Sequence, residues 1–559
     1  MNRIVECVPN ISNGTHPEIY NTVAKACEKI PGVKLLDVDP GRATNRTVIT
    51  FAGAPEVIVD AAFEVIKLAK EMIDMRGHTG EHARMGACDV CPFVPVSGVT
   101  LEDCAELARK LGKRVAEELG VWAYLYEAAA SKPEWKSLTN VRMGEYEGLE
   151  ARMGKPEWKP DFGDFTKFDP KFGAVAIGSR KFLVAYNINM NSTNKKLANE
   201  IASNIRETGK NKRQYYPDGP FVKNPDGTNV KEPGLFTHCK AGAWIIPEYN
   251  RAQITMNLTD TDVTPVHTVF DVVEKQAFER GMRVTGSEIV GLVPLKALTD
   301  AGKHFLKKQG LSSAVSEKEL VRTAILSLGL NDVAQFKPED KIVEWRLARK
   351  GRLVDLTVDV FADTLASDAP APGGGSVAAL CGNLGASLAT MVSNLTFGKK
   401  DYKTKNAQME EIGLKGQSLK AFFLDAIDKD TDSFNKVMEA SRLPKDTDEQ
   451  KKVRELAIDE ANKESILVPL SVLERTVEVL PLMLTVATEG NKNCASDAGV
   501  GAYCLLTCAE GAAMNVKINL KNITDEVFKS DVLKRMDKAL LLVRKEVPVI
   551  VAAVEKNLI

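Results

Sequence analysis

The sequence has no excess of either charge and no long hydrophobic run, and we expect no secretory leader. Its 559 residues include 74 Lys or Arg and 75 Asp or Glu, so the formal net charge is -1. A chain this close to neutral lacks the electrostatic footprint of a nucleic-acid-binding protein. No stretch reaches about 18 uninterrupted apolar residues, and the first residues lack the apolar centre of a signal peptide. We therefore expect a cytoplasmic protein with no nucleic-acid or membrane partner.

The ten cysteines do not form the closely spaced pairs of a disulfide framework or a zinc ribbon. Most lie within apolar runs, such as Cys104 in LEDCAEL and Cys381 in VAALCGNLG. This distribution is typical of reduced, buried thiols in an intracellular enzyme. The one C-x-x-C pair, Cys88 and Cys91, lies in a segment with a strand pattern, where an offset of three residues places side chains on opposite faces.

The first third of the sequence alternates short β-branched runs with helical periodicity. Residues 1–181 have the order β-α-β-β-α-β-α-β, which is typical of a ferredoxin-like α/β sandwich. The strand at 90–96 contains two prolines, which predicts that it lies at an edge or ends early. The same order restarts at 182–347, with a turn-rich insertion at 211–230 that is too long for a tight connection. Two such units in tandem commonly bind a ligand between them.

The periodicity changes after residue 347. Residues 348–353 are basic and irregular, and we interpret them as a linker. From 354 to 559 apolar residues recur every three to four positions, as they do in bundle helices. The predicted fold is therefore α/β plus all-α: two tandem ferredoxin-like subdomains followed by a helical-bundle domain.

The stretch RGHTGEHARMGACDVCPF at 76–93 has three open interpretations. His78, Glu81 and His82 fit the H-x-x-E-H pattern of a zinc-dependent hydrolase. That pattern needs a continuous helix, and Gly77 and Gly80 each cost a helix about 1 kcal/mol relative to alanine. A polar loop without a chemical role is the second interpretation. The third is a proton-transfer loop, because glycines let the backbone approach a ligand and histidine titrates near neutral pH.

Further polar residues in the amino half lie where loops meet strands, a usual place for binding residues. Asp39 and the cluster Thr44, Asn45 and Arg46 are the candidates for substrate binding. Arg46 fits a solvated strand position equally well.

Two features of the helical half carry possible chemistry. The sequence Ala-Pro-Gly-Gly-Gly-Ser at 371–376 precedes a helix, where free backbone N–H groups attract an anion. It is not a P-loop, because no Gly-Lys-Ser/Thr follows. An unliganded helix entry would have the same sequence.

Asp430 occupies one position of an apolar helical stripe. Phe423, Ile427, Phe434 and Val437 are the other members, and Asp430 falls between them at steps of three and four. Burial among such side chains raises the pKa of a carboxyl group, and a protonated carboxyl group near neutral pH is a usable general acid. A buried aspartate bonded to a helix end is the alternative. Off the stripe, we expect solvated side chains at Asp425, Asp428 and Asp432.

Several motifs together resemble the formiminotransferase-cyclodeaminase family, the bifunctional folate enzymes of histidine degradation. They are VECVPNIS, LLDVDPGRATNRTV, RGHTGEHARMGACDVCPFVPV, GEYEGL, PDFG, VGLVPLKAL and ITDEVF, in the expected order over essentially the whole chain. The resemblance implies transfer of a formimino group from N-formimino-L-glutamate to N5 of tetrahydrofolate. It further implies cyclisation of 5-formimino-tetrahydrofolate to 5,10-methenyl-tetrahydrofolate with release of ammonia.

The resemblance also implies roles for individual residues. His82 corresponds to the proton carrier of the transferase and Asp430 to the proton donor of the cyclodeaminase, while Ala83 departs from the proline common in relatives. The implied folate contacts are Gly163, Asp164, Phe165, Thr166, Lys167, Phe168, Asp169, Pro170, Lys171, Phe172 and Gly173, then Gly234, Leu235 and Phe236, and in the helical half Gly373, Gly374, Gly375 and Ser376. The aromatic rings among them can stack on a pterin or pack beneath a loop.

The expected partners are small-molecule substrates and further copies of the chain. Tetrahydrofolate, in polyglutamated form, enters as a co-substrate, and neither reaction requires a metal. Long amphipathic helices predict dimerisation, and the resemblance implies a ring-like octamer built on dimers. Arg349, Lys350 and Arg352 in the linker are candidates for holding a polyglutamate tail between the two steps. A folate-binding protein without activity is a further alternative.

Overall fold

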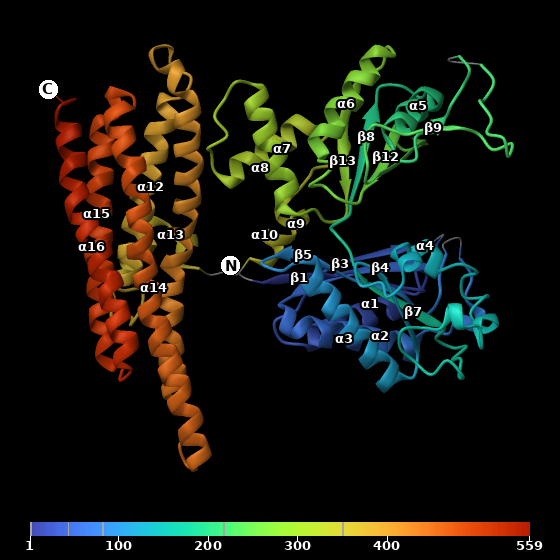
Figure 1. The fold of residues 1–559 in the computed structure, drawn as a ribbon, viewed down its shortest axis with the longest axis horizontal. Coiled ribbons are helices and arrows are strands. Elements are labelled where there is room, and N and C mark those ends of the chain that lie inside the picture. Colours follow the sequence, from blue (N-terminus) through green and yellow to red (C-terminus); the bar gives the residue numbers. More distant parts are fainter. Residues whose placement is uncertain (1–2, 43, 81–82, 216–218, 349–351, 559) are drawn as a thin grey trace. The chain divides into compact units, whose positions relative to one another are not determined.

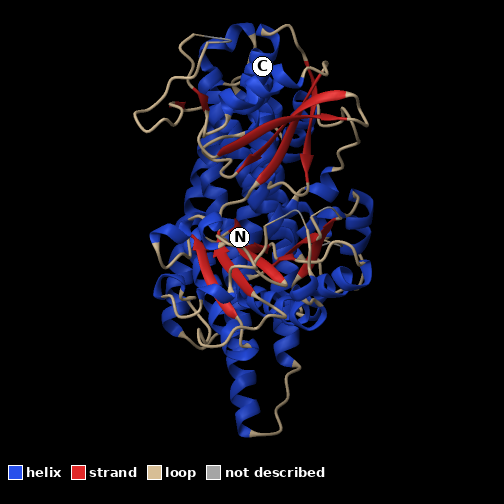
Figure 2. Cartoon of the chain, turned by 90° about the vertical axis from the view of Figure 1, so that its right-hand side faces the viewer, coloured by secondary structure: helices blue, strands red, loops and turns tan. Residues whose placement is uncertain are grey.

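A computed structural model describes the chain except for residues 1–2, 43, 81–82, 216–218, 349–351 and 559. The chain forms two compact units. The first unit comprises Met1–Ala301 and Val321–Ala348, and it contains the strands (Figures 1 and 2). The second comprises Gly302–Leu320 and Arg349–Ile559, and it is helical. The sequence therefore predicts the two fold classes and their order correctly.

The amino-terminal part of the first unit is built on a seven-stranded sheet. The strand order is β1-β4-β2-β5-β7-β6, with β3 paired to β4. Apolar side chains from one face of the sheet form a core with the helices that follow β2, β4 and β5. The elements are β1 (Ile4–Cys7), β2 (Asn10–Ile11), α1 (Pro17–Lys25), β3 (Lys34–Gly41), β4 (Arg46–Gly53), α2 (Pro55–Met72), β5 (Cys88–Ser97), α3 (Leu101–Leu119), β6 (Trp122–Glu127), α4 (Leu138–Val141) and β7 (Ala174–Ser179).

Strand β5 lies inside the sheet and continues to Ser97, so both alternatives, an edge position and an early end, are wrong. It pairs with β1 and β2 on one side and with β7 on the other. Pro92 uses its carbonyl oxygen, which accepts a hydrogen bond from the Val8 N–H at 3.1 Å, and the register shifts opposite Pro95. The ladder thus accommodates two residues that lack an N–H donor.

A second prediction about β5 is also wrong, because Cys88 and Cys91 do not lie on opposite faces. Both thiols are buried in the same hydrophobic core, and Cys91 Sγ lies 3.5 Å from Cys7 Sγ. The register between β2 and β5 shifts between Asn10 and Ile11. This bulge adds a residue to the strand and turns the two cysteines to one side. All ten cysteines are free, and eight of them are buried.

The remainder of the first unit contains a four-stranded antiparallel sheet of order β11-β12-β8-β13. The insertion predicted at 211–230 is an arm whose ends pair as the short strands β9 and β10. The elements are β8 (Val184–Met190), α5 (Lys195–Ile205), β9 (Lys210–Asn211), β10 (Lys231–Glu232), β11 (Cys239–Ile246), β12 (Arg251–Leu258), α6 (Val266–Glu279), β13 (Val284–Val290), α9 (Pro338–Lys341) and α10 (Val343–Leu347). Helices α7 (Leu295–Lys308) and α8 (Glu317–Leu328) each contain a boundary between the two units.

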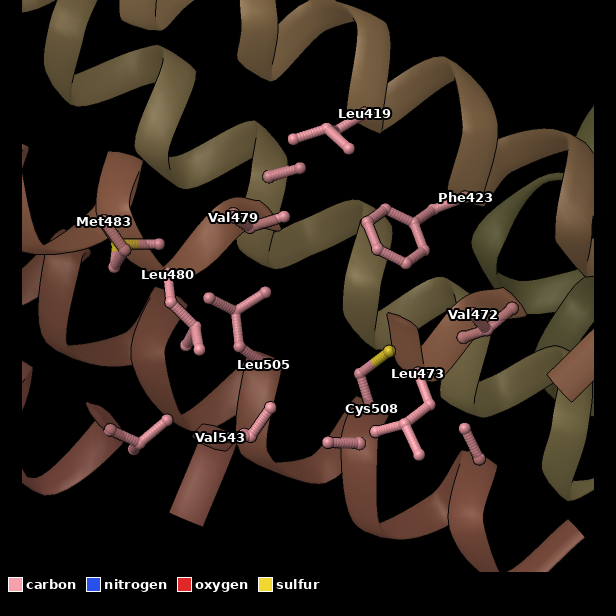
Figure 3. Packing of buried hydrophobic residues seen from close by; sticks show 14 of the residues in the cluster. Leu419, Phe423, Val472, Leu473, Val479, Leu480, Met483, Leu505, Cys508 and Val543 are labelled. Atoms are coloured by element: carbon pink, nitrogen blue, oxygen red, sulfur yellow. The ribbon is translucent and has the colours of Figure 1, made fainter. Parts of the chain in front are cut away.

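The second unit is a bundle of long helices around one core. Leu419, Phe423, Leu473, Leu505 and Cys508 meet there from three helices (Figure 3). Apart from short 3-10 turns, its elements from residue 352 onward are α11 (Val358–Leu365), α12 (Gly374–Thr396), α13 (Asn406–Ser441), α14 (Asp448–Glu489), α15 (Ala495–Asn519) and α16 (Glu526–Glu555).

Helix α12 is the central element of this bundle. An added Cβ at Gly382 would lie 2.6 Å from the Phe423 ring, so only glycine lets the two helices approach this closely. Among the described helices, α12 alone is long and apolar enough to cross a membrane. However, 61% of its most apolar window is buried inside the protein, as in a core helix.

The segment between Gly302 and Leu320 belongs to the helical unit. Ser313 donates from its backbone N–H and its hydroxyl group to Glu410 on α13, the hydroxyl bond being 2.5 Å long. The Ala314 carbonyl oxygen accepts from Asn394 at 2.8 Å and from Gln417 at 3.1 Å. These four bonds hold the segment against α12 and α13.

Candidate functional sites

In the first unit, the loop before β5 is tied to the turn between β3 and β4. The Asn45 side chain donates to the Thr79 carbonyl oxygen at 2.9 Å, and its own carbonyl oxygen meets His78 Nε2 at 2.9 Å. Asn45 has φ 46°, a left-handed conformation that asparagine tolerates well. An added Cβ at Gly80 would lie 2.3 Å from the Thr44 carbonyl oxygen. Thr44 and Asn45 therefore lie beside this loop, and their predicted role in substrate binding stays a prediction.

Both ring nitrogens of His78 are engaged. Nε2 faces the Asn45 carbonyl oxygen, so it carries the proton, and Nδ1 accepts from Arg84 Nε at 3.4 Å. Burial lowers the pKa of His78, which keeps the ring neutral near pH 7. His78 is therefore a positioning residue and not a free base or metal ligand. Glu81 and His82, the other members of the zinc pattern, lie outside the described residues.

Arg84 was not singled out in the sequence, yet it organises this site. Its guanidinium group is nearly buried and donates to Glu145 at 3.2 Å and to both oxygens of Glu147, at 2.9 and 2.5 Å. These bonds raise the pKa of Arg84 and lower that of Glu147. The three charged residues and the loop from His78 to Gly80 line an open pocket of about 520 Å³. Both glutamates belong to the GEYEGL motif, which is the feature of the sequence that could have identified them as site residues.

A buried ion pair lies beneath the loop. Asp89 is fully buried and accepts from Arg142 Nε at 3.2 Å and from the Met85 N–H at 2.9 Å. Burial lowers the pKa of Arg46, and the charge of Asp89 partly opposes that effect. Arg46 is therefore part of this charged layer and not a solvated strand residue. Asp39 is exposed on β3, and no hydrogen bond between described residues joins its side chain to the loop.

The aromatic residues of the segment 163–173 pack beneath it. Phe165 and Phe168 each lie 5.2 Å from the Trp122 ring, and Phe172 is fully buried. Asp169 pairs with Lys70 at 2.9 Å and fixes the end of the segment. The rings thus pack against the protein, and the predicted folate contacts of the segment stay predictions.

Residues Gly234 to Phe236 do not line the pocket at His78. The Leu235 N–H donates to the Asn204 carbonyl oxygen at 2.8 Å, and the Phe236 N–H donates to the carbonyl oxygen of Ile205. This segment therefore lies against the end of α5. Its predicted folate contact stays a prediction.

In the second unit, Asp430 faces a pocket of about 270 Å³ at the start of α12. Ser376 donates from Oγ to Asp430 Oδ2 at 3.1 Å. An added Cβ at Gly375 would lie 2.1 Å from Asp430 Oδ1, so the triple glycine lets the carboxyl group reach the helix end. Burial raises the pKa of Asp430, while the hydrogen bond from Ser376 opposes the rise. The arrangement suits a carboxyl group that holds and releases a proton.

The helical stripe around Asp430 divides into two parts. Phe423 and Ile427 are buried in the core, as predicted. Phe434 and Val437 instead line the pocket with Asp430, and Phe434 is 38% exposed. The stripe therefore passes from the core to the wall of a cavity.

The prediction that Asp428 is solvated is wrong. Its side chain is buried and accepts from Arg352 Nε at 3.0 Å and from the Leu353 N–H at 2.7 Å. Asp432 is half-buried, while Asp425 is exposed and pairs with Lys429 at 2.7 Å. Arg352 thus fastens the start of the helical domain to α13. Arg349 and Lys350 lie outside the described residues.

Four asparagines complete the wall of this pocket: Asn462, Asn515, Asn519 and Asn522. Asn515 and Asn519 are one helical turn apart on α15 and share a face. The Asn515 side chain donates to the Gly511 carbonyl oxygen at 2.8 Å, and Asn519 donates to Ser465 at 2.8 Å. The sequence alone assigns these asparagines no role. The spacing of four between Asn515 and Asn519 does indicate that they share a helix face, but nothing in the sequence indicates that Asn462, on α14, lines the same pocket.

Among the described residues, which leave out Glu81 and His82, no group of three His, Cys, Asp or Glu side chains could hold a metal ion. The zinc interpretation therefore has no support from the part of its pattern that is described, because His78 has both nitrogens engaged.

Comparisons with known proteins match both units. Sequence models described as "Formiminotransferase domain, N-terminal subdomain", "Formiminotransferase domain" and "Formiminotransferase-cyclodeaminase" match residues 4–180, 185–348 and 357–538. The chain is 39% identical over 558 residues to the formimidoyltransferase-cyclodeaminase of Mus musculus, covering 99% of each chain.

Two shorter relatives divide the chain between them. A glutamate formimidoyltransferase of Thermoplasma acidophilum is 40% identical over 324 residues, which is 57% of this chain and 98% of the relative. A methenyltetrahydrofolate cyclohydrolase of Methylorubrum extorquens is 41% identical over 181 residues, which is 32% of this chain and 87% of the relative. With matches over its full length and over each part, the chain belongs to the formimidoyltransferase-cyclodeaminase family.

Proposed function

We propose that the chain transfers the formimino group from N-formimino-L-glutamate to tetrahydrofolate in its first unit and cyclises the product in its second. The observation that carries the proposal is the environment of Asp430. A half-buried carboxyl group with a raised pKa lies beside a glycine turn, in a pocket whose lining includes four asparagines. Full-length similarity to formimidoyltransferase-cyclodeaminases supports the pairing of the two reactions.

The transfer needs one group that moves a proton between two nitrogens. N5 of tetrahydrofolate attacks the formimino carbon and forms a C–N bond, and a tetrahedral intermediate results. The bond from that carbon to the glutamate nitrogen then breaks, and this nitrogen must gain a proton. An imidazole with a pKa near neutral can take the proton from N5 and return it to the leaving amine. We assign this role to His82, and His78 and Arg84 position the loop that carries it.

The cyclisation needs a proton donor for the departing ammonia. N10 attacks the formimino carbon, and the former imine nitrogen becomes an amine on a tetrahedral carbon. Protonated Asp430 donates to this amine, the C–N bond breaks, and ammonia leaves. The resulting carboxylate can accept the proton that N10 loses. Folate contacts at Gly373, Gly374, Gly375 and Ser376 are consistent with this role, because these residues border the same pocket.

Two variants test the assignment of the transfer to His82 and of the cyclisation to Asp430. In His82→Ala we expect no formimino transfer but normal cyclisation of supplied 5-formimino-tetrahydrofolate. In Asp430→Asn we expect transfer to continue while 5-formimino-tetrahydrofolate accumulates. Methenyl-tetrahydrofolate absorbance and ammonia release, followed together, report both steps. Loss of both activities in either correctly folded variant would contradict the two-site assignment.

We further propose features that concern the surroundings of the reactions. Tetrahydrofolate serves in polyglutamated form and neither step uses a metal, since a titrating imidazole and a carboxyl group suffice for both proton transfers. Free and mostly buried cysteines are consistent with a reducing, cytoplasmic location. Each α/β part is a ferredoxin-like subdomain. The order β8-α5-β11-β12-α6-β13 in an antiparallel sheet supports this assignment.

Self-association through the helical unit is a related proposal. Exposed apolar side chains recur along one face of α15, at Val500, Tyr503, Met514 and Ile518. Such a stripe is typical of a helix that packs against another copy. We propose a homo-oligomer based on dimers and extending to an octamer. Sedimentation of Val500→Glu with Met514→Glu should show smaller species than the unaltered chain.

A further inference from the structure

A strongly basic pocket lies in the first unit, between α5, the arm that begins at β9 and the residue that follows α6. Its volume is about 560 Å³. Its cationic lining residues are Lys196, Arg206, Lys210, Arg213, Lys231 and Arg280. Among the described residues that line it, Glu200 is the one carboxylate. In a chain whose formal net charge is -1, six cations against one anion is a marked local imbalance.

The guanidinium groups of this pocket are held by neutral acceptors. Arg206 Nε donates to the Gly209 carbonyl oxygen at 2.7 Å, and Arg213 donates to the Gly219 carbonyl oxygen at 2.6 Å. Arg280 donates to the Gln276 carbonyl oxygen at 3.0 Å. Because a backbone carbonyl has no net charge, each guanidinium is fixed in place and keeps its positive charge.

Among the described residues that line the pocket, the ion pair of Arg280 with Glu200 is long, at 3.8 Å. At the pocket of Arg84, by contrast, one guanidinium meets two glutamates at hydrogen-bonding distance. The guanidinium groups of the basic pocket are thus held by neutral acceptors and can bind an anionic ligand.

The backbone around the pocket is close-packed, so its shape is set. Gly209 has φ 59°, and an added Cβ there would lie 1.8 Å from the Glu232 carbonyl oxygen. Arg213 stacks on the Phe221 ring at 4.3 Å, which fixes its side chain across the arm. Between them, the Asn211 side-chain oxygen is buried without a hydrogen-bond partner among the described residues. A ligand that also carries an N–H donor would satisfy it.

We propose that this pocket binds a small polyanion, a ligand with several closely spaced carboxylate or phosphate groups. Fixed guanidinium groups recognise both kinds of anion through charge-assisted hydrogen bonds. The two sources differ in one respect, because an oligoglutamate chain carries amide N–H groups for Asn211 and an oligophosphate carries none. The proposal does not depend on either reaction above, since its readout is binding alone.

Calorimetric titration of the full chain with tri-γ-glutamate and with tripolyphosphate tests this proposal. We expect saturable binding of at least one probe at low salt, weakened several-fold by added sodium chloride because screening acts on charge pairs. Tighter binding of tri-γ-glutamate assigns the pocket to a carboxylate chain, and tighter binding of tripolyphosphate assigns it to phosphates. Failure of both probes to saturate at about 5 mM, well above the range in which fixed cations bind polyanions, would overturn the proposal.

A matched pair of double variants locates the binding. Arg213→Gln with Lys231→Gln removes two lining cations and should weaken binding by about 10-fold or more. Lys212→Gln with Lys223→Gln removes the same charge from two exposed positions of the same arm, outside the pocket lining. It should change affinity less than about 2-fold, as expected for screened surface charges. Equal losses in the two variants would show a diffuse electrostatic effect and overturn the assigned site.

Discussion

Replacing Gly375 by alanine should impair the cyclodeaminase reaction and spare the transferase. Gly375 is the second residue of α12, and its backbone lies directly against the carboxyl group of Asp430. An added Cβ would lie 2.1 Å from Oδ1 and 2.5 Å from Cγ of Asp430. Ordinary contacts between such atoms are at about 3.5 Å, so the carboxyl group or the helix must move by about 1 Å.

The two possible responses have different costs. Shifting a packed helix to relieve one extra methyl group costs about 1–3 kcal/mol of stability. Rotating one carboxyl group away from Ser376 costs less, because the pocket beside it provides space. We therefore expect the side chain to move and the fold to persist. A catalytic group displaced by about 1 Å lowers a rate by about 100-fold.

The assay is ammonia release from 5-formimino-tetrahydrofolate, with formimino transfer by the same chain as the internal control. Gly373→Ala is the comparison variant, because an added Cβ there meets nothing within 4 Å. It should lose much less activity than Gly375→Ala. Near-normal cyclisation in Gly375→Ala would refute the placement of Asp430 against the helix end. Equal losses in both variants would show that the backbone of the turn, and not its contact with Asp430, matters.

Three further predictions follow from charges in the structure. Ser376→Ala removes a hydrogen bond that lowers the pKa of Asp430, so Asp430 should keep its proton to higher pH. The pH above which the cyclisation rate declines should therefore rise. A shift of this decline to lower pH would contradict the role of Asp430 as an acid. Burial raises the pKa of Glu6 to about 8, so between its ordinary pKa and pH 8 the folded state keeps a proton that the unfolded chain loses. As the pH rises through this range, the free energy of unfolding should fall by up to about 1.4 kcal/mol per pH unit. In thermal unfolding measured over this range, Glu6→Gln should lack that dependence on pH. Arg142→Met leaves Asp89 buried without its guanidinium partner and should cost about 3–5 kcal/mol in denaturant unfolding, with partial recovery when Asp89→Asn is added.

Local signals in the sequence determined several elements completely. Helix α3 begins after Thr100, which forms a capping box with Asp103, and it ends at Gly120 in the left-handed conformation. Both end signals and the apolar period lie within the helix itself or next to it. The bounds of the helix, Leu101–Leu119, therefore follow from its own residues and their immediate neighbours. The same holds for the loop around Gly77 and Gly80, whose glycines disfavour an α-helix: Met75–Gly77 is a short 3-10 turn, and residues 78–80 are not helical.

Errors arose where a partner distant in sequence decides the outcome. The neighbours of Asp428 along its own helix predict a solvated side chain. Its side chain is instead buried against Arg352, which lies 76 residues away in the sequence. Cys88 and Cys91 follow strand alternation until a bulge against β2 turns both into one core. The Arg84 site likewise joins positions more than 60 residues apart. Periodicity contains no information on such contacts.

The chain passes from one compact unit to the other three times, after Ala301, after Leu320 and after Ala348. A truncation at residue 354 would remove the hydrogen-bonding partner of Glu410 and uncover the surface of α13 at Gly413, where an added Cβ would meet Ala314. Separate expression of the helical half would therefore yield a bundle that lacks the segment Gly302–Leu320. To measure either half in isolation, inactivating substitutions in the intact polypeptide are the sounder choice.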